Sequence, residues 1–139
     1  MWLAYAGAIP FVLCAGLMAI GYINLPLLGE LAPIINTYSL VIIAFMAGIY
    51  WGLYLNGQSH SNLYLLIISN VLAITSWLAY LYIAMPVILL FYSFIFVLLL
   101  VIDFRLLSQG IITQRYFKTR SIVTMIVIAS LTIGYAAFK

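Results

Sequence analysis

The sequence contains very little charge. Of its 139 residues, two are acidic, five are Lys or Arg and one is His, whereas 68% are hydrophobic. A soluble domain carries about 25% charged residues, and the 5% found here is too little to cover a surface in contact with water. The composition excludes a soluble, disordered or nucleic-acid-binding domain. It predicts an integral membrane protein whose first partner is the lipid bilayer.

Residues that carry catalytic or metal chemistry are also scarce. Cys14 is the only cysteine, which excludes an intrachain disulfide and a CxxC pair, and we interpret it as a small buried hydrophobe. Leu13 is not small and no basic residue precedes Cys14, so neither a lipoprotein site nor a cleavable signal peptide is expected. His60 has no cysteine or carboxylate in its polar loop. We therefore expect no metal, no cofactor and no enzymatic activity.

Long apolar runs make up most of the chain. A helix needs about 20 apolar residues to cross the hydrocarbon core of a bilayer. The run at 63–104 has 42 residues, and we divide it at Pro86, which suits the first turn of a helix. The prediction is an all-α integral membrane protein, a five-transmembrane-helix bundle in one domain, 1–139, with helices at about 2–23, 34–55, 63–82, 86–104 and 121–138.

The basic residues predict an orientation. Four of the five lie between residues 105 and 120, and loops rich in Lys and Arg stay in the cytoplasm. Five crossings then place the N-terminus inside and Lys139 outside. We expect the inner (cytoplasmic) membrane of a bacterium, with the mitochondrial inner membrane as the alternative.

Small side chains recur at helical spacing and predict helix-packing faces, because small residues let transmembrane helices approach closely. The same faces are also suited to self-association, and the sequence does not separate the two uses. In the first helix, Pro10 frees the carbonyl of Ala6 and predicts a kink. The second helix carries Ala44, Gly48 and Gly52, the third carries Ser69, Ala73 and Ser76, and the last carries Ser130 and Gly134.

A few polar side chains lie within or near the apolar runs. Asn70 either bonds to a neighbouring helix or lines a polar cavity, because an amide in hydrocarbon needs partners. Asp103 and Arg105 are two residues apart and do not face each other on a helix. We expect Asp103 to pair with a basic residue at the start of the last helix and to clamp helices four and five. The alternative role for Asp103 is a proton relay or a substrate-binding carboxylate. The candidate basic partners are Arg115, Lys118 and Arg120. The alternative interpretation of these three residues is a solvated loop that contacts lipid headgroups.

Aromatic residues gather where the helices are expected to end. Tyr and Trp side chains favour membrane interfaces, and this explanation is preferred here to ligand stacking. The outer group comprises Trp77, Tyr80 and Tyr82, and the inner group comprises Tyr50, Trp51 and Tyr54.

Several segments in order resemble one protein family. They are Gly7-Ala-Ile-Pro-Phe11, Ala44–Gly52 with its Tyr-Trp-Gly ending, Ser69–Trp77, Asp103-Phe-Arg-Leu-Leu and Gln114–Arg120. The chain is similar to the small multispanning proteins of proteobacteria and mitochondria related to human transmembrane protein 69, a domain of unknown function (number 3429). The resemblance implies a five-helix inner-membrane protein and no particular activity. Tyr50 stands where the family motif has His or Arg, which argues against a charged or metal-binding site there.

Two functions remain after these exclusions. The first is a non-enzymatic accessory subunit or assembly factor that packs against a larger membrane complex, for example a respiratory one, through its small-residue faces. The alternative is a small oligomeric transporter or channel. Its path would be lined by Asn70, Tyr50, Trp51 and Asp103.

Overall fold

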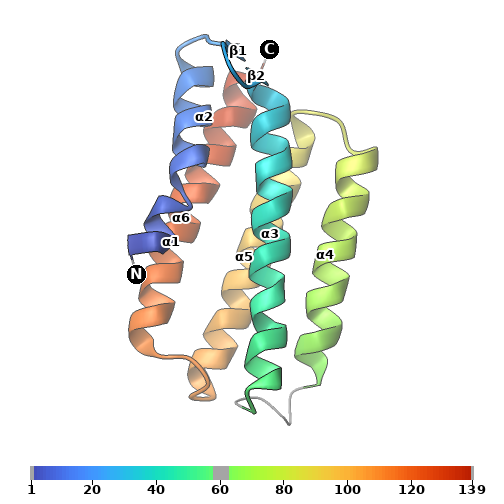
Figure 1. Cartoon of the computed structure of the whole chain (residues 1–139), viewed down its shortest axis with the longest axis vertical. Coiled ribbons are helices and arrows are strands. Elements are labelled where there is room, and N and C mark those ends of the chain that lie inside the picture. The colour runs from blue at the N-terminus through green and yellow to red at the C-terminus, as the bar shows by residue number, and fades with distance from the viewer. Residues whose placement is uncertain (1, 58–62, 139) are drawn as a thin grey trace.

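A computed structural model describes residues 2–57 and 63–138. Most of these residues are helical, and the helices run side by side along the long axis of the molecule (Figure 1). The elements are α1 (Trp2–Ala6), α2 (Ile9–Ala19), β1 (Asn24–Leu25), β2 (Gly29–Glu30), α3 (Leu31–Leu55), α4 (Tyr64–Tyr82), α5 (Val87–Ser108) and α6 (Gln114–Ala137).

The prediction of five apolar helices is confirmed for the described part of the chain. Five spans are long and apolar enough to cross a membrane, with α1 and α2 together forming the first. Each contains at least 18 residues, and a helix rises about 1.5 Å per residue, so even the shortest approaches the thickness of a hydrocarbon core. The fold is consistent with a multi-pass membrane protein.

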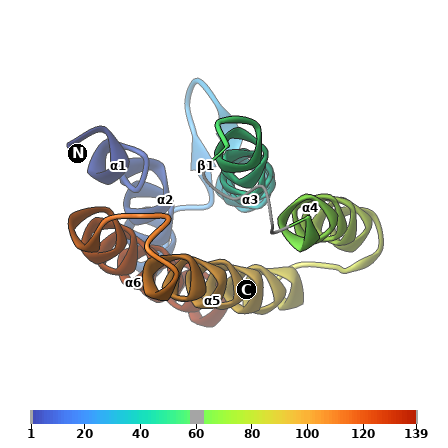
Figure 2. The same cartoon turned by 90° about the horizontal axis from the view of Figure 1, so that it is seen from below.

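The helices form a closed arrangement in which α5 contacts three neighbours. It packs against α3, α4 and α6, while α2 packs against α3 and α6, and α3 packs against α4 (Figure 2). The short antiparallel pair of β1 and β2 joins α2 to α3 at the end of the bundle where α4 turns into α5 (Figure 1). The end of α3, the start of α4 and the connection from α5 to α6 lie at the opposite end.

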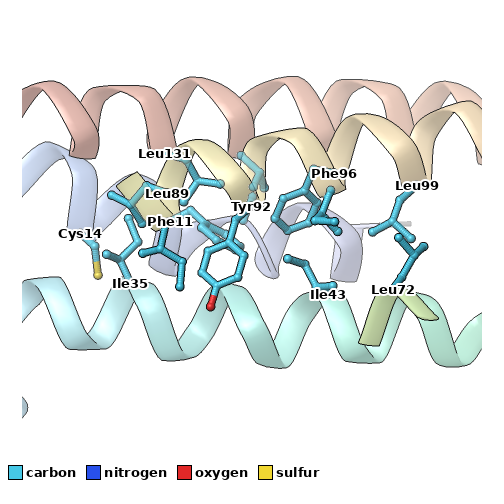
Figure 3. Packing of buried hydrophobic residues seen from close by; sticks show 14 of the residues in the cluster. Phe11, Cys14, Ile35, Ile43, Leu72, Leu89, Tyr92, Phe96, Leu99 and Leu131 are labelled. Carbon is cyan, nitrogen blue, oxygen red and sulfur yellow. The ribbon is translucent and has the colours of Figure 1, made fainter. Parts of the chain in front are cut away.

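One face of each helix supplies the core. On α3, residues at intervals of three or four point inward, because such residues share one side of a helix. The close-up view shows side chains of α2, α3, α5 and α6 meeting between the helices (Figure 3). The buried set on α3 is Leu31, Ile35, Ser39, Ile43, Ala47 and Tyr50. On α5 it is Ile88, Leu89, Tyr92, Ile95, Phe96, Leu99, Asp103 and Leu106.

The first span is interrupted, as the proline in it predicts. Helix α1 ends at Ala6 and α2 begins at Ile9, with Pro10 in its first turn. Pro10 has no N–H to donate to Ala6, so regular hydrogen bonding cannot continue through this point. The Gly7 carbonyl beside the break accepts a hydrogen bond of 2.9 Å from the hydroxyl of Tyr38 on α3. A side chain of a neighbouring helix thus satisfies a backbone group that the interruption exposes.

Four helix ends differ from the sequence prediction by three residues or more, and the first of them is the end of α2, at Ala19 rather than 23. Helix α3 begins at Leu31 and includes Pro33, because a proline in the first turn removes only an N–H that lacks an intrahelical acceptor. Helix α5 continues to Ser108, and α6 begins at Gln114 rather than at 121. The basic residues from Arg115 to Arg120 are therefore helical and do not form a loop.

Turn chemistry explains the short connection between α5 and α6. Gly110 has a positive φ of 75°, which ends α5, and the Thr113 hydroxyl accepts a 3.2 Å hydrogen bond from the Tyr116 N–H. Both are ordinary helix-boundary features. Charged side chains, in contrast, do not by themselves end a helix.

The predicted small-residue row faces the bundle interior on α4 and is exposed on α3, where its use by a partner stays a prediction. Ser69 and Ser76 are buried, Ala73 is partly buried, and the Ser69 hydroxyl donates a 2.7 Å hydrogen bond to the Ala47 carbonyl of α3. On α3, however, the row that faces the bundle contains Ala47. The predicted row of Ala44, Gly48 and Gly52 is exposed, and no atom lies within 4 Å of a Cβ built at either glycine. Gly48 follows Ala47 by one residue, so the predicted row is rotated by about 100° around the helix axis from the row that faces the interior.

Gly134 and Gly48 provide a direct test of this assignment. A Cβ at Gly134 would lie 3.3 Å from Leu89 Cδ1 and 3.6 Å from Ile35 Cδ1, whereas Gly48 faces open space. We expect Gly134→Leu to lower the free energy of unfolding by about 1–3 kcal/mol, the usual cost of overpacking. Gly48→Leu should not lower stability, and removal of a glycine from the helix interior should raise it by about 0.5–1 kcal/mol. Reversible unfolding of the purified protein in mixed micelles measures both. Equal losses for the two variants would show that α3 is rotated from the position described.

Candidate functional site

The main polar site is an ion pair between α5 and α6. Arg120 Nη2 lies 2.8 Å from Asp103 Oδ2, and Arg120 Nε donates a hydrogen bond of 3.0 Å to the same oxygen. Asp103 is 2% exposed and Arg120 is 8% exposed. Among the three basic residues considered as partners of Asp103, Arg120 is the one that makes this contact. The pair connects the two helices at the end where they are joined.

Tyr50 extends the ion pair to a third helix. Its hydroxyl lies 3.1 Å from Asp103 Oδ1, to which it donates, and 3.2 Å from the Leu99 carbonyl. The side chain is 1% exposed, so Tyr50 belongs to the interior and not to the interfacial aromatic belt that its sequence position predicted. Each carboxylate oxygen of Asp103 thus has a donor, as a buried carboxylate requires. One residue of α5 is bound by side chains of both α3 and α6.

This Tyr50–Asp103–Arg120 cluster lies inside the spans but near their ends. Tyr50 is five residues before the end of α3, Asp103 is five before the end of α5, and Arg120 is six after the start of α6. At 1.5 Å per residue these positions are about 7–9 Å from the helix ends. Each oxygen of the Asp103 carboxylate is engaged in a contact with another helix. The arrangement is therefore suited to holding helices together.

The other predicted members of the polar site do not join the cluster. Asn70, Trp51, Arg105 and Arg115 are all exposed on the outside of the bundle. A polar path lined jointly by Asn70, Trp51 and Asp103 is consequently not formed within one chain, because these residues face different directions. The remaining belt residues of the outer group, Trp77, Tyr80 and Tyr82, are exposed, as expected for interfacial aromatics.

Asn70 and Gly48 lie on the same outer face. Ala47 and Ser69 touch at the α3–α4 contact, and Gly48 and Asn70 are the residues that follow them. Because the two helices run antiparallel, the next residue in each turns to the same side of the pair. Asn70 therefore lies beside the exposed row of Ala44, Gly48 and Gly52 at similar depth. Its amide makes no hydrogen bond with any side chain or backbone group that the structure describes.

An apolar groove adjoins the ion pair on another side of the bundle. It has a volume of about 300 Å³ and is bounded by α1, α2, α3, α5 and α6. Arg120 and Tyr116 are the ionisable residues in its lining. The apolar walls include Leu3, Phe11, Phe45, Met46, Phe96 and Val127.

A second set of polar atoms lies toward the opposite end of the bundle. Asn36 Oδ1, Ser76 Oγ and Tyr92 Oη are buried and have no hydrogen-bond partner among the described residues. The Tyr92 hydroxyl points toward α3 (Figure 3). Tyr92 is thus a buried tyrosine without the contacts that Tyr50 makes, and it serves as an internal reference for Tyr50.

The described residues do not form a metal centre. No group of three His, Cys, Asp or Glu side chains comes together in residues 2–57 and 63–138. His60, the one histidine considered in the sequence, lies outside the described residues.

Some features of the site were not predicted from the sequence. Met46 and Tyr116 flank Arg120, and neither was identified as a candidate. The sequence also did not lead us to predict that Tyr50 points into the bundle and hydrogen-bonds Asp103. Its spacing from Ile43, seven residues or two helical turns, is the signal that would have placed Tyr50 on the buried face.

The fold and the site define a class before they define a family. In the described residues, five helices are long and apolar enough to cross a membrane, which is consistent with a multi-pass membrane protein, and a buried ion pair joins α5 to α6 with a hydrogen bond from Tyr50 of α3. Residues 1–136 match the model of a protein family of unknown function, DUF3429, and the chain belongs to that family. Comparison with curated proteins and with solved structures gives no match.

Removing one member of the ion pair should destabilise the bundle strongly. Asp103→Asn leaves the Arg120 charge buried without a counter-ion, and we expect a loss of about 3–5 kcal/mol in the free energy of unfolding. The double variant Asp103→Leu/Arg120→Met should recover most of that loss, because no isolated charge remains. Arg115→Ala is the matched control for loss of an exposed cation. A stable Asp103→Asn variant would contradict the proposed clamp.

The two buried tyrosines give a finer comparison in the same unfolding assay. Tyr50→Phe removes hydrogen bonds to Asp103 and Leu99, and should cost about 1–3 kcal/mol. Tyr92→Phe removes a hydroxyl without a partner and should be neutral or stabilising. The reverse order would exclude Tyr50 as a member of the clamp.

Proposed function

We propose that this protein is a non-enzymatic accessory subunit or assembly factor that packs laterally against another membrane protein. The observation that carries the proposal is the outer face of α3 and α4. There an amide without a partner in the described chain, Asn70, lies beside two exposed glycines, Gly48 and Gly52.

The chemistry of this face favours a helix of another subunit over lipid. Asn70 is six residues, or about 9 Å, from the start of α4, so its amide is at membrane depth. Lipid tails offer no hydrogen bond, and an amide there is satisfied by a polar group of another helix. The glycines allow a partner backbone to come close enough to supply such a group. Interhelical hydrogen bonds of this kind contribute about 0.6–2 kcal/mol.

The absence of a reactive arrangement among the described residues gives no support to an enzymatic role. Asp103 is fully engaged in holding helices, and the groove is lined almost entirely by hydrocarbon. The proposed location is the bacterial inner membrane, with the mitochondrial inner membrane as the alternative, and we propose a relationship to transmembrane protein 69. The proposed partner is a larger complex, for example a respiratory one. A second copy of this chain is the other partner that the same face would accept.

Lateral association is tested by changing the face without changing the fold. Gly48→Leu and Asn70→Leu should each reduce recovery of the co-purifying membrane protein about tenfold after mild solubilisation, because a loss of roughly 1.4 kcal/mol has that effect. Gly16→Leu is the matched control, since Gly16 is also exposed and a Cβ at that position would have no atom within 4 Å. Native electrophoresis of the wild type should show a species larger than the monomer.

Two results would overturn the association proposal. One is migration of the wild type at monomer mass only. The other is full recovery of the partner with both Gly48→Leu and Asn70→Leu. A complex containing only this chain would identify self-association as the use of the face.

We further propose that the end of the bundle carrying the ion pair faces the cytoplasm. Arg105, Arg115 and Lys118 are exposed at that end, and exposed cations flanking membrane spans remain inside. Glu30 is exposed at the opposite end.

Thiol labelling of spheroplasts, in which the inner membrane is intact and accessible from outside, tests this orientation. In a Cys14→Ser background, Glu30→Cys should react with an impermeant maleimide, and Lys118→Cys should react only after permeabilisation. The opposite pattern would invert the proposed topology, and labelling of both without permeabilisation would contradict the five-span threading.

A further inference from the structure

The groove beside Arg120 has exposed rims and a buried floor. Leu3 and Phe45 at its edge are 69% and 64% exposed, whereas Phe11 and Val127 are buried. In a bilayer such a groove opens to the acyl chains and not to water. Anything that enters it must therefore be soluble in lipid.

The guanidinium of Arg120 forms the polar end of the groove, and the ion pair with Asp103 does not use all of its N–H donors. Arg120 donates to Asp103 through Nε and Nη2, and its Nη1 is directed at the Met46 sulfur. A thioether is a weak acceptor, so Nη1 retains donor capacity at a position that is more than nine-tenths buried. A buried donor of this kind gains from a better acceptor. Both Met46 and Arg120 line the groove.

The local charge determines which acceptor is favoured. Asp103 lies 2.8 Å from Arg120 and neutralises its charge. A second carboxylate or phosphate at Nη1 would meet the field of Asp103, and the described lining residues offer no second cation, since Tyr116 is the only other ionisable residue among them. An uncharged carbonyl avoids this repulsion and still accepts a charge-assisted hydrogen bond.

We propose that the groove binds a lipid-soluble molecule with an uncharged carbonyl head and an apolar tail. The carbonyl accepts from Arg120 Nη1 in place of the Met46 sulfur, and the tail leaves between Leu3 and Phe45. The volume of about 300 Å³ holds a head group and the first part of a tail. Two membrane components share this chemistry: a quinone, whose ring suits the aromatic walls, and an ester-linked acylglycerol. The proposal does not depend on lateral association through the α3–α4 face.

Photo-crosslinking of the full-length protein in nanodiscs of ether-linked phosphatidylcholine, which has no ester carbonyl, tests the proposal. Three probes are compared: a short-chain photoreactive quinone, a diazirine monoacylglycerol and a diazirine fatty acid. We expect saturable labelling of the groove segments 2–11, 42–49 and 116–127 by the quinone or the acylglycerol, competed by the unlabelled molecule. The labelled probe identifies the source of the carbonyl. The fatty acid should compete at least about tenfold more weakly, as expected for a difference of roughly 1.4 kcal/mol.

Two variants link the labelling to the groove itself. Ala4→Phe places a ring in the groove and should reduce saturable labelling about tenfold, whereas Leu13→Phe adds a ring on the exposed face of the same span and should not. The Asp103→Leu/Arg120→Met variant should also lose labelling while remaining folded, as its unfolding curve will show. Labelling that does not saturate, that persists in Ala4→Phe, or that the fatty acid competes equally well would overturn the proposal.

Discussion

In a bundle with apolar inner faces, a carboxylate is tolerated only where its charge and both oxygens are satisfied. Asp103 meets this condition by taking Arg120 from α6 and Tyr50 from α3. These two contacts determine how α5 and α6 are aligned along the bundle axis and how α3 is rotated about its own axis. Once Tyr50 faces inward, Ile43 and Ala47 face inward as well, and Ala47 meets Ser69 on α4. The groove and the outer face of α3 are consequences of the same rotation.

The helices themselves were predictable because membrane spans are defined by length and hydrophobicity, which a sequence displays directly. Their ends were less predictable. The basic residues after Phe104 suggest a loop, but α6 takes in Arg115 through Arg120 and leaves only a short turn. Arg120 can lie in the interior of the bundle because Asp103 neutralises it, a contact between elements that local sequence does not encode. Gly110 and Thr113 were better boundary markers than the charges.

The site was predictable in part for a related reason. A carboxylate near one span end and cations near the next require pairing, and this requirement placed Asp103 opposite the start of α6. It did not select Arg120 from Arg115 and Lys118, since that choice depends on helix rotation. The same uncertainty affected α3, where the rows containing Ala47 and Gly48 both carry small residues. Hydrophobic periodicity is weak when lipid-facing and buried positions are both apolar, so only the packed structure distinguishes them.

The rotation of α3 also separates the two proposed binding surfaces. Met46 lines the groove and Gly48 lies on the outer face, two residues apart and therefore about 200° apart around the helix. Between them, Ala47 and Tyr50 face the interior. A ligand at Arg120 and a partner at Gly48 would thus contact opposite sides of one rigid helix without touching each other. Coupling between them would pass through α3, which contacts the helices bearing the ion pair through the Tyr50 hydrogen bond to Asp103 and through Met46 beside Arg120.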